Sequence, residues 1–324
     1  MQIAFIGFGE AARAFRESLT ATEPAIEFAA YDILVDTEGR QGPCGAAMRA
    51  HGVEVAESAR QAVSEADWIV SAVTADQSLE AVRSALPHVK PGQVFIDINS
   101  VSPQRKRDSA ALLEPSGATY IDMAVMAPVH PRGHRTTVLL AGPMGDELRR
   151  RLAALDFSFE VVGPQAGAAT AIKMVRSLFV KGLEAITVET LLAAAASGCL
   201  DYILRSLIGS YPGLGFPDFA SYQFERTVKH GKRRAAEMRE SAATLDDLQL
   251  HGRLADAVAE VQELMGRLSG KPEGELQDTV ASLLAERRRP EASGCAAGFT
   301  HLRRHGRDQK LRHPRAGAER SEET

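Results

Sequence analysis

The segment that most constrains the fold is residues 3–15, IAFIGFGEAARAF. Residues 3–6 form an apolar run that is typical of a buried strand. Gly7 and Gly9 follow it, and Ala12 completes the spacing G-x-G-x-x-A. Residues 11–19 are rich in alanine and predict a helix. A strand, a glycine turn and a helix in this order predict the opening of an α/β domain.

The small residues of this turn have separate steric roles. Gly7 permits a tight turn, Gly9 lets the backbone approach a pyrophosphate, and Ala12 allows the helix to contact the strand closely. The N-terminus of the helix presents free N–H groups and the positive end of its dipole to phosphates. The candidate cofactor-binding residues of the turn are Gly7, Phe8, Gly9, Glu10, Ala11 and Ala12.

Asp32 ends the next apolar run, residues 26–31. A carboxylate at this place can accept hydrogen bonds from the ribose hydroxyls of NAD, and it would repel the 2′-phosphate of NADP. Asp32 can also be read as an ordinary turn residue at the end of a strand. We expect NAD as the cofactor, with NADP disfavoured.

Two other classes of nucleotide-binding protein fit the turn less well. A P-loop kinase needs G-K-S or G-K-T after the glycines, and no such sequence follows. A methyltransferase can share the glycine turn but should carry a separate acceptor-specific region. The helical second half of the chain fits a dehydrogenase better.

Strand and helix patterns alternate through the first half of the chain. Strands are expected over 26–31, 68–73, 94–98, 119–123 and 138–141, and helices over 59–65, 79–86 and 103–113. This alternation predicts a doubly wound, mainly parallel sheet with helices on both faces. We place this α/β domain at residues 1–163 and expect it to bind NAD.

The second half has a different character. Helices are expected over 168–197, 201–207, 219–243 and 254–268, with no strand pattern between them. We place an all-α domain for substrate binding and dimerisation at residues 164–286. From Arg287 the chain is basic and offers few apolar residues, so residues 287–324 are predicted to be a disordered basic tail.

Composition excludes several partners and locations. The 324 residues carry a formal net charge of -4, which argues against nucleic acid. The apolar start lacks a positive leading region and is cut at Gly7, so we do not expect it to be a signal peptide, and residues 186–199 are too short for a membrane span. Cys44, Cys199 and Cys295 form no C-x-x-C pair, which favours the cytoplasm and no metal site.

Candidate site residues follow the ends of two predicted strands. Val73 and Thr74 follow one strand, and Asn99 and Ser100 follow the next. Ligands of doubly wound sheets bind at such carboxyl ends. We expect Val73, Thr74 and Asn99 to contact the cofactor and Ser100 to contact the substrate. Ser102 before Pro103 also reads as an ordinary helix cap.

Residues 122–135 form a loop that contains two histidines and two arginines, His130, Arg132, His134 and Arg135. Cationic groups on such a loop could receive an anionic substrate. The same composition is also typical of a solvated surface loop.

Lys173 lies in an apolar helical segment that starts after the glycines of residues 163–167. Burial would lower the pKa of this amine and suit it to general acid–base chemistry. Ser177 lies one turn further along the same face. The alternative interpretation is a surface lysine whose stem packs on apolar side chains.

Together these segments resemble the β-hydroxyacid dehydrogenase superfamily, which includes 3-hydroxyisobutyrate and 6-phosphogluconate dehydrogenases. Residues 97–103 look like its D-x-S/N-T-x-x-P segment, residues 122–128 lie where it has D-A-P-V-S-G-G, and residues 163–177 look like its lysine motif. The resemblance covers about residues 1–270. It implies a Rossmann domain, a helical domain, a homodimer, a nicotinamide cofactor and Lys173 as the general acid/base on a hydroxy acid.

The chain also departs from that family. Met126, Ala127 and Pro128 stand in place of Ser-Gly-Gly, so this loop cannot hold a carboxylate in the usual way, and Ser177 replaces an asparagine. The departures resemble a divergent branch with a phosphogluconate-dehydrogenase-like C-terminal domain of uncertain function. Candidate substrate contacts are Ser100, Met126, Ala127, Pro128, His130, Arg132, Ser177 and His230.

We therefore predict an NAD-dependent dehydrogenase of a small, anionic 3-hydroxy acid. Two alternatives stay open: an imine or ketone reductase on the same scaffold, and a catalytically silent NAD-binding regulator. In imine reductases the resemblance places Asp or Tyr where Lys173 stands, and this favours an alcohol substrate.

Overall fold

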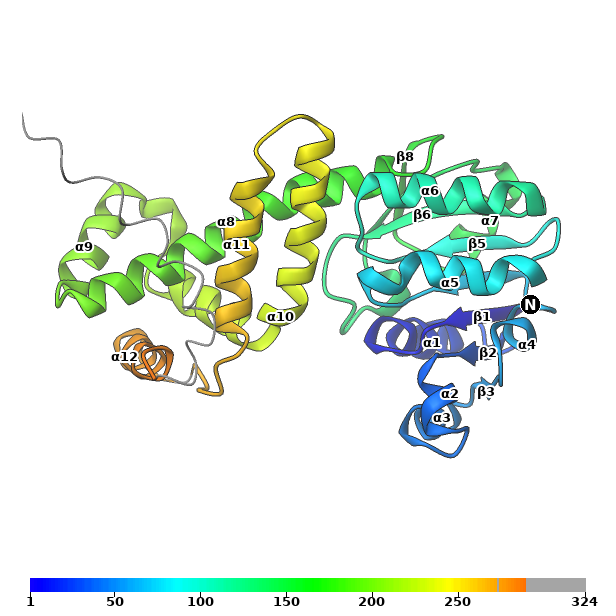
Figure 1. Ribbon diagram of the computed structural model, residues 1–324, viewed down its shortest axis with the longest axis horizontal. Helices are drawn as coiled ribbons and strands as arrows, with labels where there is room; N and C mark the ends of the chain where they lie inside the picture. Colours follow the sequence, from blue (N-terminus) through cyan, green and yellow to red (C-terminus); the bar gives the residue numbers. More distant parts are fainter. Residues whose placement is uncertain (273, 290–324) are drawn as a thin grey trace, which may run out of the picture.

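The structure is a computed structural model, and it describes residues 1–272 and 274–289. A sheet domain lies at one end and a helical bundle at the other, and helix α8 (Ala168–Ala196) joins them (Figure 1). The prediction of a Rossmann domain followed by an all-α domain is confirmed. The predicted tail lies almost entirely outside the described residues, since only 287–289 are included.

The sheet has eight strands in the order β3-β2-β1-β4-β5-β6-β7-β8. All neighbouring strands are parallel except β6 and β7, which are antiparallel. The strand order reverses direction next to β1, which pairs with both β2 and β4, and a crevice opens at such a switch point. The strands are β1 (Gln2–Ile6), β2 (Glu27–Tyr31), β3 (Glu54–Val55), β4 (Trp68–Ser71), β5 (Val94–Asp97), β6 (Thr119–Val125), β7 (Val138–Ala141) and β8 (Phe159–Gly163).

Helices cover both faces of the sheet and enclose two apolar cores. One core contains Phe5, Phe15 and Trp68, and the other contains Ile69 and Phe95. The sequence predicted α1, α4, α5 and α6 but not α2, α3 and α7. The helices of this domain are α1 (Glu10–Thr22), α2 (Leu34–Glu38), α3 (Pro43–Ala50), α4 (Ala59–Val63), α5 (Ser78–Ala85), α6 (Pro103–Leu113) and α7 (Asp146–Ala154).

The helical bundle consists of the end of α8 with α9 (Leu200–Ser210), α10 (Asp218–Asp247), α11 (Gly252–Met265) and α12 (Leu276–Arg287). Helix α10 runs antiparallel to α8, since Ser241 bonds to Met174 while Phe224 shares a core with Val188. Gly231 allows α10 to approach α11 closely, because a Cβ there would lie 2.1 Å from the carbonyl oxygen of Gln262. None of the described helices is long and apolar enough to cross a membrane.

The two domains share one helix and further contacts. The last strand ends at Gly163 and α8 begins at Ala168, where Ala169 packs against the sheet residues Ala124 and Leu139. Glu240 of α10 accepts a hydrogen bond from the backbone N–H of Ser102 at 2.7 Å. The bundle is therefore fastened to the sheet domain by α8 and by α10.

Candidate active site

The glycine turn has the geometry that phosphate binding requires. Gly7 has a φ of +85°, and a Cβ there would lie 2.6 Å from the carbonyl oxygen of Ala72. Gly9 precedes α1 without a side-chain cap, and a Cβ there would meet no atom within 4 Å. The N–H groups at the start of α1 therefore face open space that a pyrophosphate could fill.

Asp32 ties the end of β2 to this turn. Its Oδ2 accepts a hydrogen bond from the backbone N–H of Phe8 at 2.8 Å, and its Oδ1 accepts one from Leu34 at 3.0 Å. Asp32 therefore makes the hydrogen bonds of an ordinary turn residue, and these also hold its carboxylate beside the glycine turn. Because each carboxylate oxygen has two lone pairs, Asp32 keeps capacity for a further donor.

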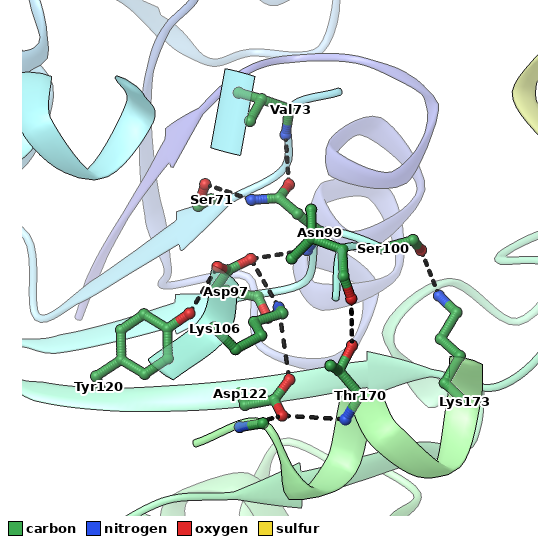
Figure 2. Close-up of polar contacts among 12 residues, drawn as sticks. Ser71, Val73, Asp97, Asn99, Ser100, Lys106, Tyr120, Asp122, Thr170 and Lys173 are labelled. Atoms are coloured by element: carbon green, nitrogen blue, oxygen red, sulfur yellow. Dashed lines mark hydrogen bonds and ion pairs between the residues drawn. The ribbon is translucent and has the colours of Figure 1, made fainter. Parts of the chain in front are cut away.

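Asn99 braces the ends of β4 and β5 (Figure 2). Its Oδ1 accepts the backbone N–H of Val73 at 2.7 Å, and its Nδ2 donates to the hydroxyl of Ser71 at 2.9 Å. Asn99 is buried, whereas Thr74 is exposed at the strand end. Asn99 thus fixes the shape of the crevice at the residues that the sequence assigns to the cofactor.

A buried ionic cluster lies beneath these strand ends, and sequence reasoning missed it. The ammonium of Lys106 on α6 lies 2.8 Å from Asp97 of β5 and 3.5 Å from Asp122 of β6. All three side chains are fully buried, and Tyr120 donates to Asp97 at 2.7 Å. Burial raises the pKa of Asp122, and the nearby Lys106 cation opposes this rise.

Asp122 connects this cluster to the start of α8. Its Oδ2 accepts the backbone N–H groups of Gly167 and Thr170, each at 3.0 Å (Figure 2). These donors belong to the first turn of α8. The carboxylate therefore accepts hydrogen bonds from N–H groups that have no partner within the helix, and its negative charge interacts favourably with the positive end of the helix dipole. Lys173 lies one turn further, and the cluster therefore fixes the helix end that carries it.

Lys173 projects from α8 toward the strand ends. Its Nζ donates to the Ser100 hydroxyl at 2.5 Å, which joins the lysine to the loop after β5 (Figure 2). Burial lowers the pKa of Lys173 to about 8, and the Glu237 carboxylate opposes this effect. A lysine with such a pKa exchanges its proton readily near neutral pH.

A cleft of about 420 Å³ lies between the two domains and contains Lys173. Of the residues predicted from the sequence, it is lined by Glu10, Ala11, Ser100, Met126, Ala127, Pro128, Lys173 and Ser177. The structure thus brings the start of α1, the loops after β5 and β6, and α8 to one cavity. Lys173 lies in this cavity although its neighbours Ile172 and Val175 are exposed.

Helix α10 contributes charged residues that the sequence analysis did not identify. Glu237 lies 2.7 Å from the ammonium of Lys181, which is buried on α8, and 3.3 Å from Arg233. The Lys181, Lys173 and Arg233 cations lower the pKa of Glu237 to about 2 against the effect of burial. The one sequence signal for this charged group was the spacing of Lys173, Ser177 and Lys181, because residues four apart lie on the same face of a helix.

Most of the cationic loop lies away from the cleft. This corrects the prediction for two of its residues, His134 and Arg135. His134 is fully buried against Phe157, and its ring bonds to the hydroxyl of Ser18 at 2.7 Å. Arg135 pairs with Asp156 at 2.7 Å. Both side chains fasten the loop to the sheet domain and do not reach the cleft.

The other three candidates also lie outside the cleft lining. His130 and Arg132 are exposed on the loop, and His230 is half-buried on α10. Burial and the neighbouring arginines of α10 lower the pKa of His230. The structure therefore does not bring these residues together with Lys173.

The fold and cleft define a two-domain protein of the dinucleotide-dependent oxidoreductase type. The NAD binding domain of 6-phosphogluconate dehydrogenase matches residues 2–156, and a domain of unknown function, DUF1932, matches residues 194–265. A conserved hypothetical protein from Sinorhizobium meliloti 1021 is 33% identical with a TM-score of 0.69, covering 88% of this chain and 96% of that one.

Two further similar proteins have lower sequence identity to this chain. An uncharacterized 28.5 kDa protein of Methanothermus fervidus is 26% identical over 238 residues, which is 74% of this chain and 88% of that protein. The 3-hydroxyisobutyrate dehydrogenase of Mycobacterium tuberculosis, solved with L-serine, is 18% identical with a TM-score of 0.64, covering 87% of this chain and 98% of that one. This last likeness is one of fold.

The chain belongs to the β-hydroxyacid dehydrogenase superfamily, in the branch that joins this NAD binding domain to DUF1932. It is thereby placed among the NAD(P)-dependent oxidoreductases. The resemblance read from the sequence is confirmed at this level.

Proposed function

We propose that the chain is an NAD-dependent 3-hydroxyacid dehydrogenase and that Lys173 is its general acid/base. The observation that carries the proposal is the 2.5 Å contact between the Lys173 ammonium and the Ser100 hydroxyl within the interdomain cleft. This contact lies beside the glycine turn, because Glu10 and Ala11 line the same cleft. The pKa of about 8 supports a role in proton transfer.

The residues at the glycine turn fit a dinucleotide. The N–H groups of Glu10 and Ala11 would hold the pyrophosphate, and Asp32 would accept the ribose hydroxyls. When bound, the nicotinamide supplies the hydride acceptor for the carbon that bears the hydroxyl. Lys173 in its neutral form accepts the hydroxyl proton during oxidation and returns it during reduction, while Ser100 orients the hydroxyl.

A turnover screen tests the proposal. Purified protein is mixed with NAD and a panel of 3-hydroxy acids, and NADH formation is followed by its absorbance. The variant Lys173→Ala should lower kcat by about 10²–10⁴-fold and leave NAD affinity unchanged. Lys173→Arg should not restore kcat, because a guanidinium does not release its proton at neutral pH. An Ala variant that kept a tenth of the wild-type kcat would refute the role of Lys173.

Cofactor choice is tested separately by isothermal titration. The Asp32 carboxylate should make NAD bind at least about tenfold more tightly than NADP, because a 2′-phosphate would meet a like charge. Asp32→Ser should reduce this difference. Equal binding of the two cofactors by the wild-type protein would contradict the proposed preference.

We also propose a homodimer formed through the helical domain. Support comes from apolar side chains on α8 that are exposed in the single chain, Ile172, Val175, Phe179 and Ile186. Light scattering on the purified protein would measure the mass directly. A monomeric mass at micromolar concentration would contradict this part of the proposal.

A further inference from the structure

Lys181 lies in the cleft but belongs to none of the sequence motifs. With Lys173 and Ser177 it forms a row at four-residue spacing on one face of α8, and all three line the cleft. Its ammonium donates to Ser177 at 3.1 Å and pairs with Glu237 at 2.7 Å. An ammonium has three N–H donors, and the third has no acceptor in the described part of the chain.

The charges around Lys181 favour a second anion. Glu237 is the carboxylate partner of both Lys181 and Arg233, and Lys173 also lies close enough to act on it electrostatically. Three cations therefore share one carboxylate within a partly enclosed cleft. An arriving carboxylate would meet a net positive field there, and low solvent access would strengthen the attraction.

Four arginines also line the cleft, Arg176, Arg226, Arg233 and Arg234, of which Arg233 pairs with Glu237 and Arg234 with Glu184. Met126, Ala127 and Pro128 bring no charged side chain to the cleft. His134 and Arg135 of the same loop are bonded to the sheet domain. Among the cations that line the cleft, Lys181 is the buried one that shares a face of α8 with Lys173 and Ser177, and it is 6% exposed.

We propose that Lys181, with the Ser177 hydroxyl, receives the carboxylate of the substrate while Lys173 engages its hydroxyl. This inference rests on the proposed function and adds a carboxylate subsite to it. The two lysines are eight residues apart, which is about 12 Å along α8, and both side chains lean toward its N-terminus.

A purely structural ion pair is the competing explanation, and the variants are chosen to separate the two. Lys181→Met leaves Glu237 buried without its lysine and can lower stability for that reason alone. The double variant Lys181→Met with Glu237→Leu removes both charges and avoids an unpaired carboxylate. Lys181→Arg keeps the positive charge. Arg287→Met, which breaks the ion pair of α12 with Glu189 outside the cleft, is the matched control.

The experiment measures binding and turnover on the same proteins. Calorimetric titrations of the NADH-loaded protein use 3-hydroxypropionate, 3-hydroxybutyrate and 3-hydroxyisobutyrate, with 1,3-butanediol as the uncharged analogue. NADH formation from NAD and each acid is followed in parallel. Melting temperatures of all variants are recorded.

We expect at least one acid to bind the wild-type protein more tightly than the diol. Lys181→Met and the double variant should weaken acid binding by tenfold or more, as loss of a charge-assisted hydrogen bond implies, and leave diol binding unchanged. Lys181→Arg should stay within about threefold of wild type. Arg287→Met should bind the acids like wild type.

The subsite is overturned if no acid is preferred to the diol, or if Lys181→Met binds the acids as wild type does. If Lys181→Met transfers hydride as wild type does, the subsite is refuted and the proposed dehydrogenase function is retained. Acid binding that depends on Lys181 but yields no NADH supports the subsite and refutes the dehydrogenase.

Discussion

Lys173 is expected to reduce the stability of the protein at neutral pH. Burial lowers its pKa from 10.5 to about 8. Because the folded state binds this proton less tightly than the unfolded state, the lysine destabilises the fold by about 3 kcal/mol at pH 7. The penalty is complete below pH 8, declines between pH 8 and 10.5, and vanishes above pH 10.5.

The variant Lys173→Met removes the charge and keeps an unbranched side chain of similar length. We expect its free energy of unfolding at pH 7 to exceed that of wild type by about 2–3 kcal/mol, since loss of the Ser100 hydrogen bond offsets part of the gain. The gain should shrink to near zero at pH 10.5. Urea denaturation across this range measures both values without a substrate.

Lys229, which is exposed on α10, supplies the control for a lysine in solvent. Lys229→Met should change the free energy of unfolding by less than about 0.5 kcal/mol at either pH. The reasoning is refuted if Lys173→Met is no more stable than wild type at pH 7. It is also refuted if the gain is the same at both pH values, because burial of a methionine alone would give that result.

Three further outcomes are expected. Glu237→Gln should move the pKa of Lys173 below about 8, because Glu237 raises it, and the pH dependence of amine labelling at Lys173 measures this shift. His134→Ala should lower the free energy of unfolding by about 2–3 kcal/mol in urea melts, whereas Arg132→Ala should change it by less than about 0.5 kcal/mol. Gly7→Ala should weaken NAD binding at least tenfold in titrations, because its Cβ would displace the backbone at Ala72.

Much of the fold can be predicted from local sequence patterns. Buried strands such as β1 and β4 are continuous apolar runs, and Pro103 marks the start of α6. Strand β8 escaped detection because it is half-exposed and lacks a clear apolar run, and β3 has only two residues. The antiparallel step from β6 to β7 depends on how the intervening loop packs, and no local pattern encodes that.

The candidate site was predictable only where it is built from contiguous motifs. Ser100 and Lys173 each lie in a recognisable segment, and the structure brings them into contact. The partnership of Lys181 with Glu237 depends on how α8 packs against α10, and it joins residues that are far apart in the chain. The polar loop of His134 misled the prediction, because a histidine that serves packing has the same local sequence as one that serves binding.

The continuous helix α8 has a consequence for how substrates reach Lys173. A helix of 29 residues is about 44 Å long, and its first turn is pinned to the sheet by Asp122 while its last turns lie inside the bundle. Domains that move about a hinge need a segment whose backbone dihedral angles can change. The continuous helix α8 is a rigid connection and does not provide such a segment along its length. A change in the width of the entrance would therefore need movement at the turn before α8, where Gly167 has a φ of +95°, rather than bending of the helix itself.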